Sequence, residues 1–321
     1  MPVRICKDKN MEIQKSINSL LELFLPTYNR KRFLANTLAQ LTAPESPVRN
    51  CQMTILDNAS TDGTKELLEE YAARFPNIKL IHHPKNIGGN ANIARCFELA
   101  TAPFMWAVCD DDAFRWDSWA EIETALLSDQ YDILLTRKYF LKGTSNIAKI
   151  IRQLTFLPAG IYRTRYITAG VLINMFNNIP NLLPHMALIC EIINKKGILF
   201  IPEGEIIAQT GIEIASPLKG VDQNTYTPQS AREMFWVVGF FNSLQLLEDK
   251  KLRTYVMNHL GRHGFFGYLM GAFRLNYTQH KASPRNIRLM INNMTLWQRF
   301  EFFWVRTALK ILTMFRKRKQ K

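Results

Sequence analysis

The chain of 321 residues is 47% hydrophobic and 21% charged, a composition that excludes a disordered protein and suits one large α/β domain or one domain with an appendage. Its net charge of +14 predicts a negatively charged partner: nucleic acid, an anionic membrane surface or a phosphorylated substrate. No apolar run reaches the ~18 residues that a membrane-spanning helix needs, and the first residues lack the apolar core of a signal peptide.

Five cysteines are spread along the chain, an odd number without any CxxC pair. This spacing argues against a disulfide framework and against a zinc site, and it fits a reducing compartment. We therefore expect a cytoplasmic protein, either soluble or peripheral on the inner face of the plasma membrane.

Strand-like and helix-like segments alternate through the first half of the chain. The apolar run at 21–25 predicts a strand that ends in a loop at Pro26, and helical spacing follows at 31–41. The further predicted strands are 53–56, 78–82, 104–108 and 133–135, and the further predicted helices are 64–75, about 89–99 and 116–127. Such alternation indicates a largely parallel sheet with helices on both faces, in which ligands bind at the carboxyl ends of the strands.

The second half carries weaker patterns. Residues 139–180 are mixed and loop-rich, whereas 184–196 has helical spacing with a proline in its first turn and Gly197 as the stop. A strand is expected at 198–201. From about Ser230 onward the pattern is helical and aromatic.

Three adjacent carboxylates, Asp110, Asp111 and Asp112, follow the predicted strand at 104–108. Like charges at the end of a buried strand repel one another and cost stability unless a cation lies near. Mg²⁺ or Mn²⁺, held by one or two carboxylates and by phosphate oxygens of a substrate, is the usual compensation. A polar loop that caps the next helix is the alternative interpretation of the same residues.

Three further polar motifs lie at strand ends: PTYNR at 26–30, DNASTDGT at 57–64 and NIGG at 86–89. Together with the aspartate triplet they resemble the donor-binding half of the family 2 glycosyltransferases, which carry a DxD signature on a single Rossmann-like domain. The resemblance covers about residues 20–135 and is greatest to bacterial enzymes that build O-antigen, capsule or related surface polysaccharides. It implies an α/β fold of the GT-A type: a Rossmann-like, mixed but mostly parallel sheet with helices on both faces, plus a C-terminal helical extension.

The resemblance also implies a division of the chain and a reaction. Residues 1–19 would be an N-terminal extension, and 20–225 the glycosyltransferase domain, with a nucleotide-sugar-binding half at 20–135 and an acceptor-binding half at 136–225. Residues 226–321 would form a helical C-terminal region with a basic amphipathic end. The reaction would move a sugar from a nucleotide-diphosphate sugar, with UDP favoured, to a hydroxyl of a glycan or a polyprenyl-linked acceptor, with inversion.

Donor-binding roles follow from the resemblance residue by residue. Thr27 and Tyr28 would line the pocket of the base, and Asp57 would accept an N–H from it. Asn86 and Gly88 would shape the turn below the nucleotide, where glycine allows close backbone approach. The full implied donor-binding set is Pro26, Thr27, Tyr28, Asn29, Asp57, Asn86, Gly88, Asn92, Asp110 and Asp111.

The resemblance assigns the aspartate triplet to the sugar and the metal. Asp110 would hold the ribose or the sugar, and Asp112 would ligate the metal that bridges the two phosphates, with Asp110 as the other candidate ligand. The implied cofactor is Mn²⁺ or Mg²⁺, which would act as a Lewis acid and stabilise the negative charge of the departing diphosphate.

Two positions depart from the family pattern. Ala91 stands where the family often has arginine, and the predicted helix at 184–196 lacks the acidic pair that usually supplies the catalytic base. His185 stands nearest to the place of that pair, and an imidazole can deprotonate a hydroxyl at neutral pH. Glu191 is the second candidate base. A histidine with a purely structural role is the alternative interpretation.

The C-terminal stretch 296–315 has an apolar side at helical spacing, formed by Leu296, Phe300, Phe303, Trp304, Ile311 and Phe315. Basic residues at 316–319 and 321 follow the stretch, and this combination suits an anionic membrane surface. A packed core helix would show the same apolar side, and a solvated basic tail is the alternative for the charges.

Two other functions fit parts of the sequence. A nucleotidyltransferase or another nucleotide-binding α/β enzyme also uses metal-binding aspartates, but many carry a glycine-rich phosphate loop after the first strand, and the motif at 26–30 has no glycine. A non-catalytic nucleotide-sugar-binding protein of the same fold would explain the missing acidic pair. A nucleic-acid partner is not expected, because the positive charge is not organised around a recognisable binding module.

Overall fold

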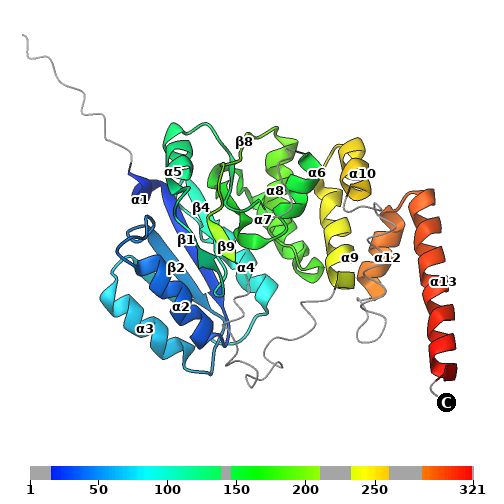
Figure 1. Cartoon of the computed structure of the whole chain (residues 1–321), viewed down its shortest axis with the longest axis horizontal. Helices are drawn as coiled ribbons and strands as arrows, with labels where there is room; N and C mark the ends of the chain where they lie inside the picture. Colours follow the sequence, from blue (N-terminus) through cyan, green and yellow to red (C-terminus); the bar gives the residue numbers. More distant parts are fainter. Residues whose placement is uncertain (1–15, 139–145, 210–232, 260–283, 320–321) are drawn as a thin grey trace, which may run out of the picture.

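The computed structural model of the chain describes residues 16–138, 146–209, 233–259 and 284–319 (Figure 1). Its strands are β1 (Leu21–Thr27), β2 (Gln52–Asp57), β3 (Ile78–His82), β4 (Phe104–Ala107), β5 (Ala113–Phe114), β6 (Ile133–Leu135), β7 (Gly160–Arg163), β8 (Leu199–Phe200) and β9 (Ile207–Gln209). Within the described residues they form a seven-stranded sheet in the order β3-β2-β1-β4-β7-β6-β8 and a two-stranded sheet of β5 and β9.

The helices alternate with the strands in the first half and dominate the second. They are α1 (Ile17–Leu20), α2 (Lys31–Thr42), α3 (Thr64–Arg74), α4 (Gly89–Glu98), α5 (Trp119–Ser128), α6 (Ile147–Gln153), α7 (Ala169–Asn177), α8 (Met186–Asn194), α9 (Glu233–Ser243), α10 (Lys250–Asn258), α12 (Pro284–Asn293) and α13 (Leu296–Lys319). Short 3₁₀ turns connect several of them, among them η3 (Ile179–Asn181). The expected C-terminal helical extension is therefore confirmed.

The sheet is mixed and mostly parallel, as the sequence predicts. β1 pairs in parallel with β2 and β4, β2 pairs in parallel with β3, and β6 pairs in parallel with β8. The exception is β7, which runs antiparallel between β4 and β6. The strand β7 lies in the segment 139–180 that the sequence presents as loop-rich, as do α6 and α7.

Alternating side chains divide the core between the two faces of the sheet. In β1, Leu21, Leu23 and Leu25 belong to the cluster with α1, α2, α3 and α5, whereas Phe24 belongs to the cluster on the other face. The second cluster joins α4, α6 to α10, α12 and the buried Phe302 of α13. Strand geometry gives this period of two, and burial on both faces explains the continuous apolar runs in the sequence.

The C-terminal helices extend the molecule to one side of the sheet, with α13 at its outer end (Figure 1). Asp249 caps α10 by accepting hydrogen bonds from the backbone N–H groups of Lys251 and Leu252. Among the described residues, no helix combines the length and the apolar character needed to cross a membrane.

Candidate functional site

The carboxyl ends of the parallel strands bring the predicted polar residues to one edge of the sheet. Thr27 at the end of β1 pairs in register with Asp57 at the end of β2, and Asp57 pairs with His82 at the end of β3. Asp110 follows β4, and its Oδ2 accepts a hydrogen bond of 2.7 Å from the Thr27 hydroxyl. Four residues from separate strand ends therefore lie along this edge, which is where open α/β sheets bind ligands.

Arg30 neutralises part of the aspartate triplet. It precedes α2, and its Nε lies 3.4 Å from Asp110 Oδ1 while its Nη2 forms an ion pair with Asp111 Oδ2. Burial raises the pKa of Asp110 to about 6 and Asp111 adds to this rise, whereas Arg30 and the Thr27 hydroxyl lower it. The pair with Arg30 thus offsets only part of the cost of burying the carboxylate.

Asp112 is the most deeply buried member of the triplet. Its Oδ2 accepts a hydrogen bond of 3.2 Å from the backbone N–H of Cys109, but its buried Oδ1 has no hydrogen-bond partner among the described residues. Burial raises the pKa of Asp112 to about 8, and the neighbouring carboxylates of Asp111 and Asp110 contribute to this rise. The hydrogen bond from the Cys109 N–H and the charge of Arg137 lower the pKa by less. A buried oxygen without a partner is costly, so the site lacks a positive or hydrogen-bonding group at this atom.

The backbone after the triplet is held in place from two sides. Gln40 of α2 donates from Nε2 to the carbonyl oxygen of Asp112 at 3.2 Å, and its Oε1 accepts from the N–H of Phe114 at 3.0 Å. The N–H of Arg115 donates to the carbonyl of Ile206 at 2.8 Å, just before β9. These contacts hold the backbone of the acidic loop to α2 and to the segment before β9.

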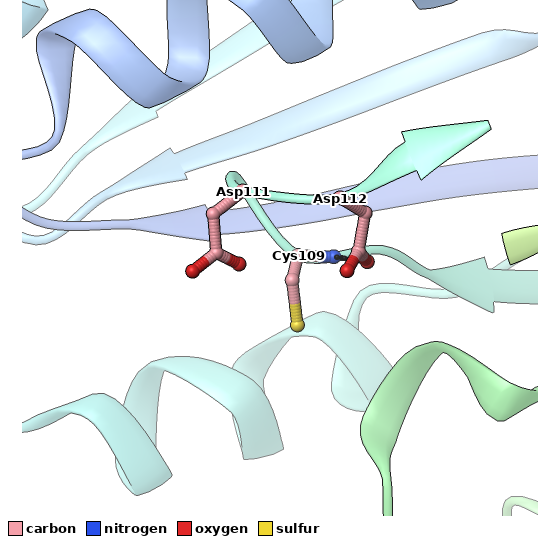
Figure 2. Close-up of side chains that lie close together, drawn as sticks. All are labelled: Cys109, Asp111 and Asp112. Atoms are coloured by element: carbon pink, nitrogen blue, oxygen red, sulfur yellow. Dashed lines mark hydrogen bonds between the residues drawn. The ribbon is translucent and has the colours of Figure 1, made fainter. Parts of the chain in front are cut away.

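The acidic cluster fits a hard divalent cation. One ligand atom each of Cys109, Asp111 and Asp112 lie within 4.8 Å of one another, and Figure 2 shows all three side chains on the same side of the loop. Burial and the three neighbouring carboxylates raise the pKa of the Cys109 thiol well above its usual value. Hard divalent cations such as Mg²⁺ or Mn²⁺ prefer oxygen ligands to sulfur, so the two carboxylates are the better donors for such an ion.

The structure groups Asp111, rather than Asp110, with Asp112 in this cluster. Both carboxylate oxygens of Asp110 already face other groups, Oδ2 the Thr27 hydroxyl and Oδ1 Arg30. The assignment of Asp112 and Asp110 as metal ligands remains a prediction, and Asp111 joins them as a candidate.

Asp57 is almost fully buried and organises the turn after β2. Its Oδ2 lies 3.1 Å from Nδ1 of His82, and its Oδ1 accepts a hydrogen bond of 3.1 Å from the N–H of Ser60. The expected contact of Asp57 with a nucleobase remains a prediction. His82, which the sequence reading did not single out, would orient the carboxylate for that contact.

The loops after β2 and β3 are joined through asparagine side chains. Asn58 donates to Asn86 Oδ1 at 2.9 Å, and the same Asn86 oxygen accepts from the N–H of Gly88 at 2.7 Å. The N–H of Ile87 donates to Asn58 Oδ1 at 2.9 Å. Gly88 has a φ of +89°, yet a Cβ there would meet no atom within 4 Å, so backbone conformation and not crowding requires the glycine.

The other donor-binding candidates lie in two different settings. Tyr28 is 39% exposed beside the site, and the neighbouring Asn29 accepts from the N–H of Thr61 at 2.7 Å. Pro26 lies within β1. Asn92 is buried in α4 and donates to the carbonyl of Leu56 at 2.9 Å, so its side chain ties α4 to β2.

The two candidate bases lie in different environments, His185 at the N-cap of α8 and Glu191 within that helix. His185 is 2% exposed, its Nε2 lies 3.1 Å from the Leu154 carbonyl, and its buried Nδ1 has no partner among the described residues. Burial lowers the pKa of His185 to about 4. Glu191 is partly exposed and lies 3.9 Å from the ammonium group of Lys195. The burial of His185 favours a packing role, and the base assignment of both residues remains a prediction.

Long-range contacts supply the site residues that the sequence reading missed. Arg30, Gln40 and His82 each contact a candidate residue from another strand–loop unit, and Arg137 acts on Asp112 from the end of β6. Only Arg30 carried a local signal, because it belongs to the motif at 26–30. The other contacts depend on strand order, which the sequence pattern does not specify.

Comparison with known sequences identifies related sugar transferases. The abequosyltransferase RfbV of Salmonella typhimurium is 34% identical over 118 residues, which are 36% of this chain and 35% of the relative. The dolichyl-phosphate β-glucosyltransferase ALG5C of Trichomonas vaginalis is 30% identical over 110 residues, 32% of this chain and 33% of the relative. The chain thus matches about a third of the length of these curated relatives.

Solved structures share the fold. TarS 1–349 of S. aureus superimposes with a TM-score of 0.54 at 16% identity, covering 85% of this chain and 78% of that chain. The same protein in complex with UDP-GlcNAc gives a TM-score of 0.55 at 15% identity, covering 85% of this chain and 79% of that chain. The GT-A expectation is therefore confirmed at the level of the fold. The model of glycosyl transferase family 2 matches residues 22–197, more than half of the sequence, and the chain belongs to this family.

Proposed function

We propose that the chain transfers a sugar from a nucleoside-diphosphate sugar to a hydroxyl of a glycan or lipid-linked oligosaccharide in bacterial surface polysaccharide synthesis. The observation that carries the proposal is the acidic cluster at the sheet edge, where the buried Asp112 presents an unpaired oxygen beside Asp111. Two relatives are named as an abequosyltransferase and a poly(ribitol-phosphate) β-N-acetylglucosaminyltransferase, and a structure of the latter contains UDP-GlcNAc, which supports a UDP-sugar donor.

The donor would lie across the ends of β1 to β4. Thr27 and the exposed ring of Tyr28 would line the base pocket, and Asp57, oriented by His82, would accept an N–H of the base. The turn that contains Asn86 and Gly88 would lie below the nucleotide. Asp110 would accept hydrogen bonds from hydroxyl groups of the ribose or the sugar.

The carboxylates of Asp111 and Asp112, with Asp110 as a further candidate, would hold Mn²⁺ or Mg²⁺. When bound, the cation supplies positive charge that stabilises the departing diphosphate. The cation-free site disfavours ionised carboxylates, since the pKa of Asp112 is raised to about 8 by burial and by its acidic neighbours. In the proposed reaction, Asp111 and Asp112 would position the diphosphate through the cation. The site is partly buried, and electrostatic interactions are stronger there than in water.

A base would remove the proton from the acceptor hydroxyl, which would attack the anomeric carbon opposite the nucleotide and invert its configuration. His185 or Glu191 would take that proton. Of the two, Glu191 has solvent access, while His185 carries a lowered pKa and a nitrogen already directed to a backbone carbonyl. If His185 does not act as the base, His185→Ala should keep turnover and Glu191→Gln should lose it.

We also propose that the protein lies peripherally on an anionic membrane through α13. The helix buries Gln298, Phe302 and Val305 on one side. Exposed apolar side chains on the opposite side are Leu296, Trp297, Phe300, Phe303, Trp304 and Ile311. A packed core helix would bury this side, so its exposure favours the membrane interpretation over the core interpretation.

Charge supports a lipid partner for this face of α13. The helix carries basic residues at 299, 306, 310 and 316–319 but a single acidic residue, Glu301. Two copies of such a helix would repel each other, whereas anionic headgroups would attract both, and tryptophan rings suit the headgroup level. A membrane position would bring the active site to an acceptor carried on a polyprenyl lipid.

Donor turnover tests the proposed transfer. The purified chain is incubated with Mn²⁺ and UDP-, CDP-, GDP- or dTDP-sugars, and the released nucleoside diphosphate is measured. We expect one donor class to be turned over, and Asp112→Ala to lose nearly all of this activity while keeping the wild-type circular dichroism spectrum. Binding of a nucleotide-sugar without any turnover would support the non-catalytic alternative, and normal turnover by folded Asp112→Ala would exclude the metal role.

A further inference from the structure

Arg30 links the first motif of the chain to the aspartate triplet. Its guanidinium contacts both Asp110 and Asp111, stacks over the ring of Phe33 at 4.2 Å, and belongs to a side chain that is only 15% exposed. These contacts hold the guanidinium against the acidic loop. Arginine keeps its charge under all ordinary conditions, so this positive group stays beside the site.

Asp111 is shared between Arg30 and the candidate metal cluster. The same carboxylate forms the ion pair with Arg30 and lies within 4.8 Å of the ligand atoms of Asp112 and Cys109. A divalent cation at the cluster would therefore meet the guanidinium across one carboxylate. Two positive groups on either side of one carboxylate in a partly buried site repel each other, and this repulsion would weaken metal binding.

A diphosphate changes the balance of charge. Its oxygens add negative charge beside the carboxylates and offer acceptors that match the fork of N–H donors on a guanidinium. With the diphosphate present, the metal and Arg30 can both lie against negative groups. Arg30 would then favour the ternary complex, although it weakens binding of the metal alone.

We propose that Arg30 is a positioning residue that couples metal binding to nucleoside-diphosphate binding. It competes with the metal for Asp111 in the empty site, and it adds to the affinity for the diphosphate once the metal is present. This inference rests on the proposed function. Because binding free energies are linked, the factor by which the nucleotide changes metal affinity must equal the factor by which the metal changes nucleotide affinity, and Arg30 should raise this shared coupling factor.

Titration calorimetry with Mn²⁺ alone, UDP alone and UDP in saturating Mn²⁺ tests the coupling, with CDP, GDP and dTDP run in parallel. In Arg30→Gln we expect Mn²⁺ alone to bind several-fold more tightly and the nucleotide with Mn²⁺ to bind at least tenfold more weakly. A residue that only supports the fold would weaken both. The matched control is Arg32→Gln, which removes an exposed charge two residues further along α2 and should change neither affinity.

Arg30→Lys gives a second, independent readout. It keeps the positive charge and loses the fork, so Mn²⁺ alone should bind as weakly as in the wild type while the nucleotide loses affinity. Shifts of both affinities in one direction, or no shift, in folded Arg30→Gln and Arg30→Lys would overturn the coupling role. If the wild type binds none of the nucleotides with Mn²⁺, the proposed function itself fails, which is a separate result.

Discussion

At the scale of single residues, the acidic loop concentrates unfavourable electrostatics in one place. Burial raises the pKa of Asp110 to about 6 and that of Asp112 to about 8, although Arg30, Arg137 and hydrogen bonds to these carboxylates lower both values in part. Proteins retain such an arrangement where a ligand compensates it, which is why perturbed carboxylates mark functional sites. Gln40 holds the backbone of this loop through the carbonyl of Asp112.

His185 predicts a pH dependence of stability. Its pKa is lowered from 6.5 to about 4 by burial, so the unfolded chain takes up a proton at a higher pH than the folded chain does. The stabilising contribution is complete above pH 6.5 and is lost as pH falls toward 4, by about 3 kcal/mol in total. Denaturant unfolding of His185→Gln between pH 7 and pH 4 should show a flatter profile than the wild type.

The control for this measurement is the exposed His259→Gln, which should keep the wild-type profile. A wild-type slope in folded His185→Gln would mean that His185 titrates alike in the folded and unfolded chain. Such a result would also restore His185 as a base that is effective at neutral pH.

The sequence predicts the residues of the site better than their contacts. Thr27, Asp57 and the aspartate triplet follow directly from their positions at strand ends. The pairing of Arg30 with Asp111 spans 81 positions in sequence, and the contact of His82 with Asp57 requires β3 to lie beside β2. Local spacing contains no information on either contact, because both depend on how the strands assemble.

At the scale of elements, helix α9 approaches the 3₁₀ turn η3 closely. A Cβ at Gly239 of α9 would overlap the backbone carbonyl oxygen of Asn181. Asn242 on the same helix donates to Asn181 Oδ1 at 3.2 Å, so this contact also carries a hydrogen bond. The absence of a side chain at Gly239 therefore allows α9 to lie directly against η3.

Gly239→Ala should destabilise the protein by about 1–3 kcal/mol, because the new methyl group overpacks a backbone contact that cannot move away easily. The matched control is Gly170→Ala in α7, where the nearest atom to a new Cβ lies 3.8 Å away. That change should be neutral or stabilising by up to ~1 kcal/mol, since alanine is the better helix former. Equal effects of the two substitutions in thermal unfolding would contradict the close approach of α9.

Strand β7 is an element that the sequence pattern alone does not predict. Gly160–Arg163 is only four residues long, lies between short 3₁₀ turns and runs antiparallel inside an otherwise parallel region. A strand this short is identified by its neighbours β4 and β6 rather than by its own alternation. The longer parallel strands were predictable because burial on both faces makes them continuous apolar runs.

At the scale of the whole molecule, the net charge of +14 and the exposed apolar side of α13 both support the proposed anionic membrane partner. Apolar spacing alone could not distinguish a core helix from a surface helix, since both have the same period. The position of α13 at the outer end of the molecule makes the distinction (Figure 1). The buried Phe302 and Val305 lie on the side of α13 opposite the exposed rings.

Flotation with vesicles of phosphatidylglycerol and phosphatidylcholine tests the membrane proposal. The wild type should float with the anionic vesicles and dissociate as salt is raised, whereas Trp297→Ser/Phe300→Ser/Phe303→Ser should stay at the bottom of the gradient. The matched control is Ile173→Ser/Ile198→Ser, which removes exposed apolar surface elsewhere. If the triple variant, or the chain without residues 296–321, floats like the wild type, α13 is not the membrane contact. If the wild type is a dimer that the triple variant breaks, the partner of α13 is a second copy of the chain.

The proposed function depends most on a divalent cation and a diphosphate binding together at Asp111 and Asp112. Thermal-shift measurements with UDP, CDP, GDP and dTDP, each with Mn²⁺ and with a chelator, test this directly. We expect at least one nucleotide to raise the Tm of the wild type by several degrees with Mn²⁺ and not with the chelator, and Asp112→Asn to abolish that rise. A nucleotide-dependent rise that is unaffected by the chelator and by Asp112→Asn would contradict the account.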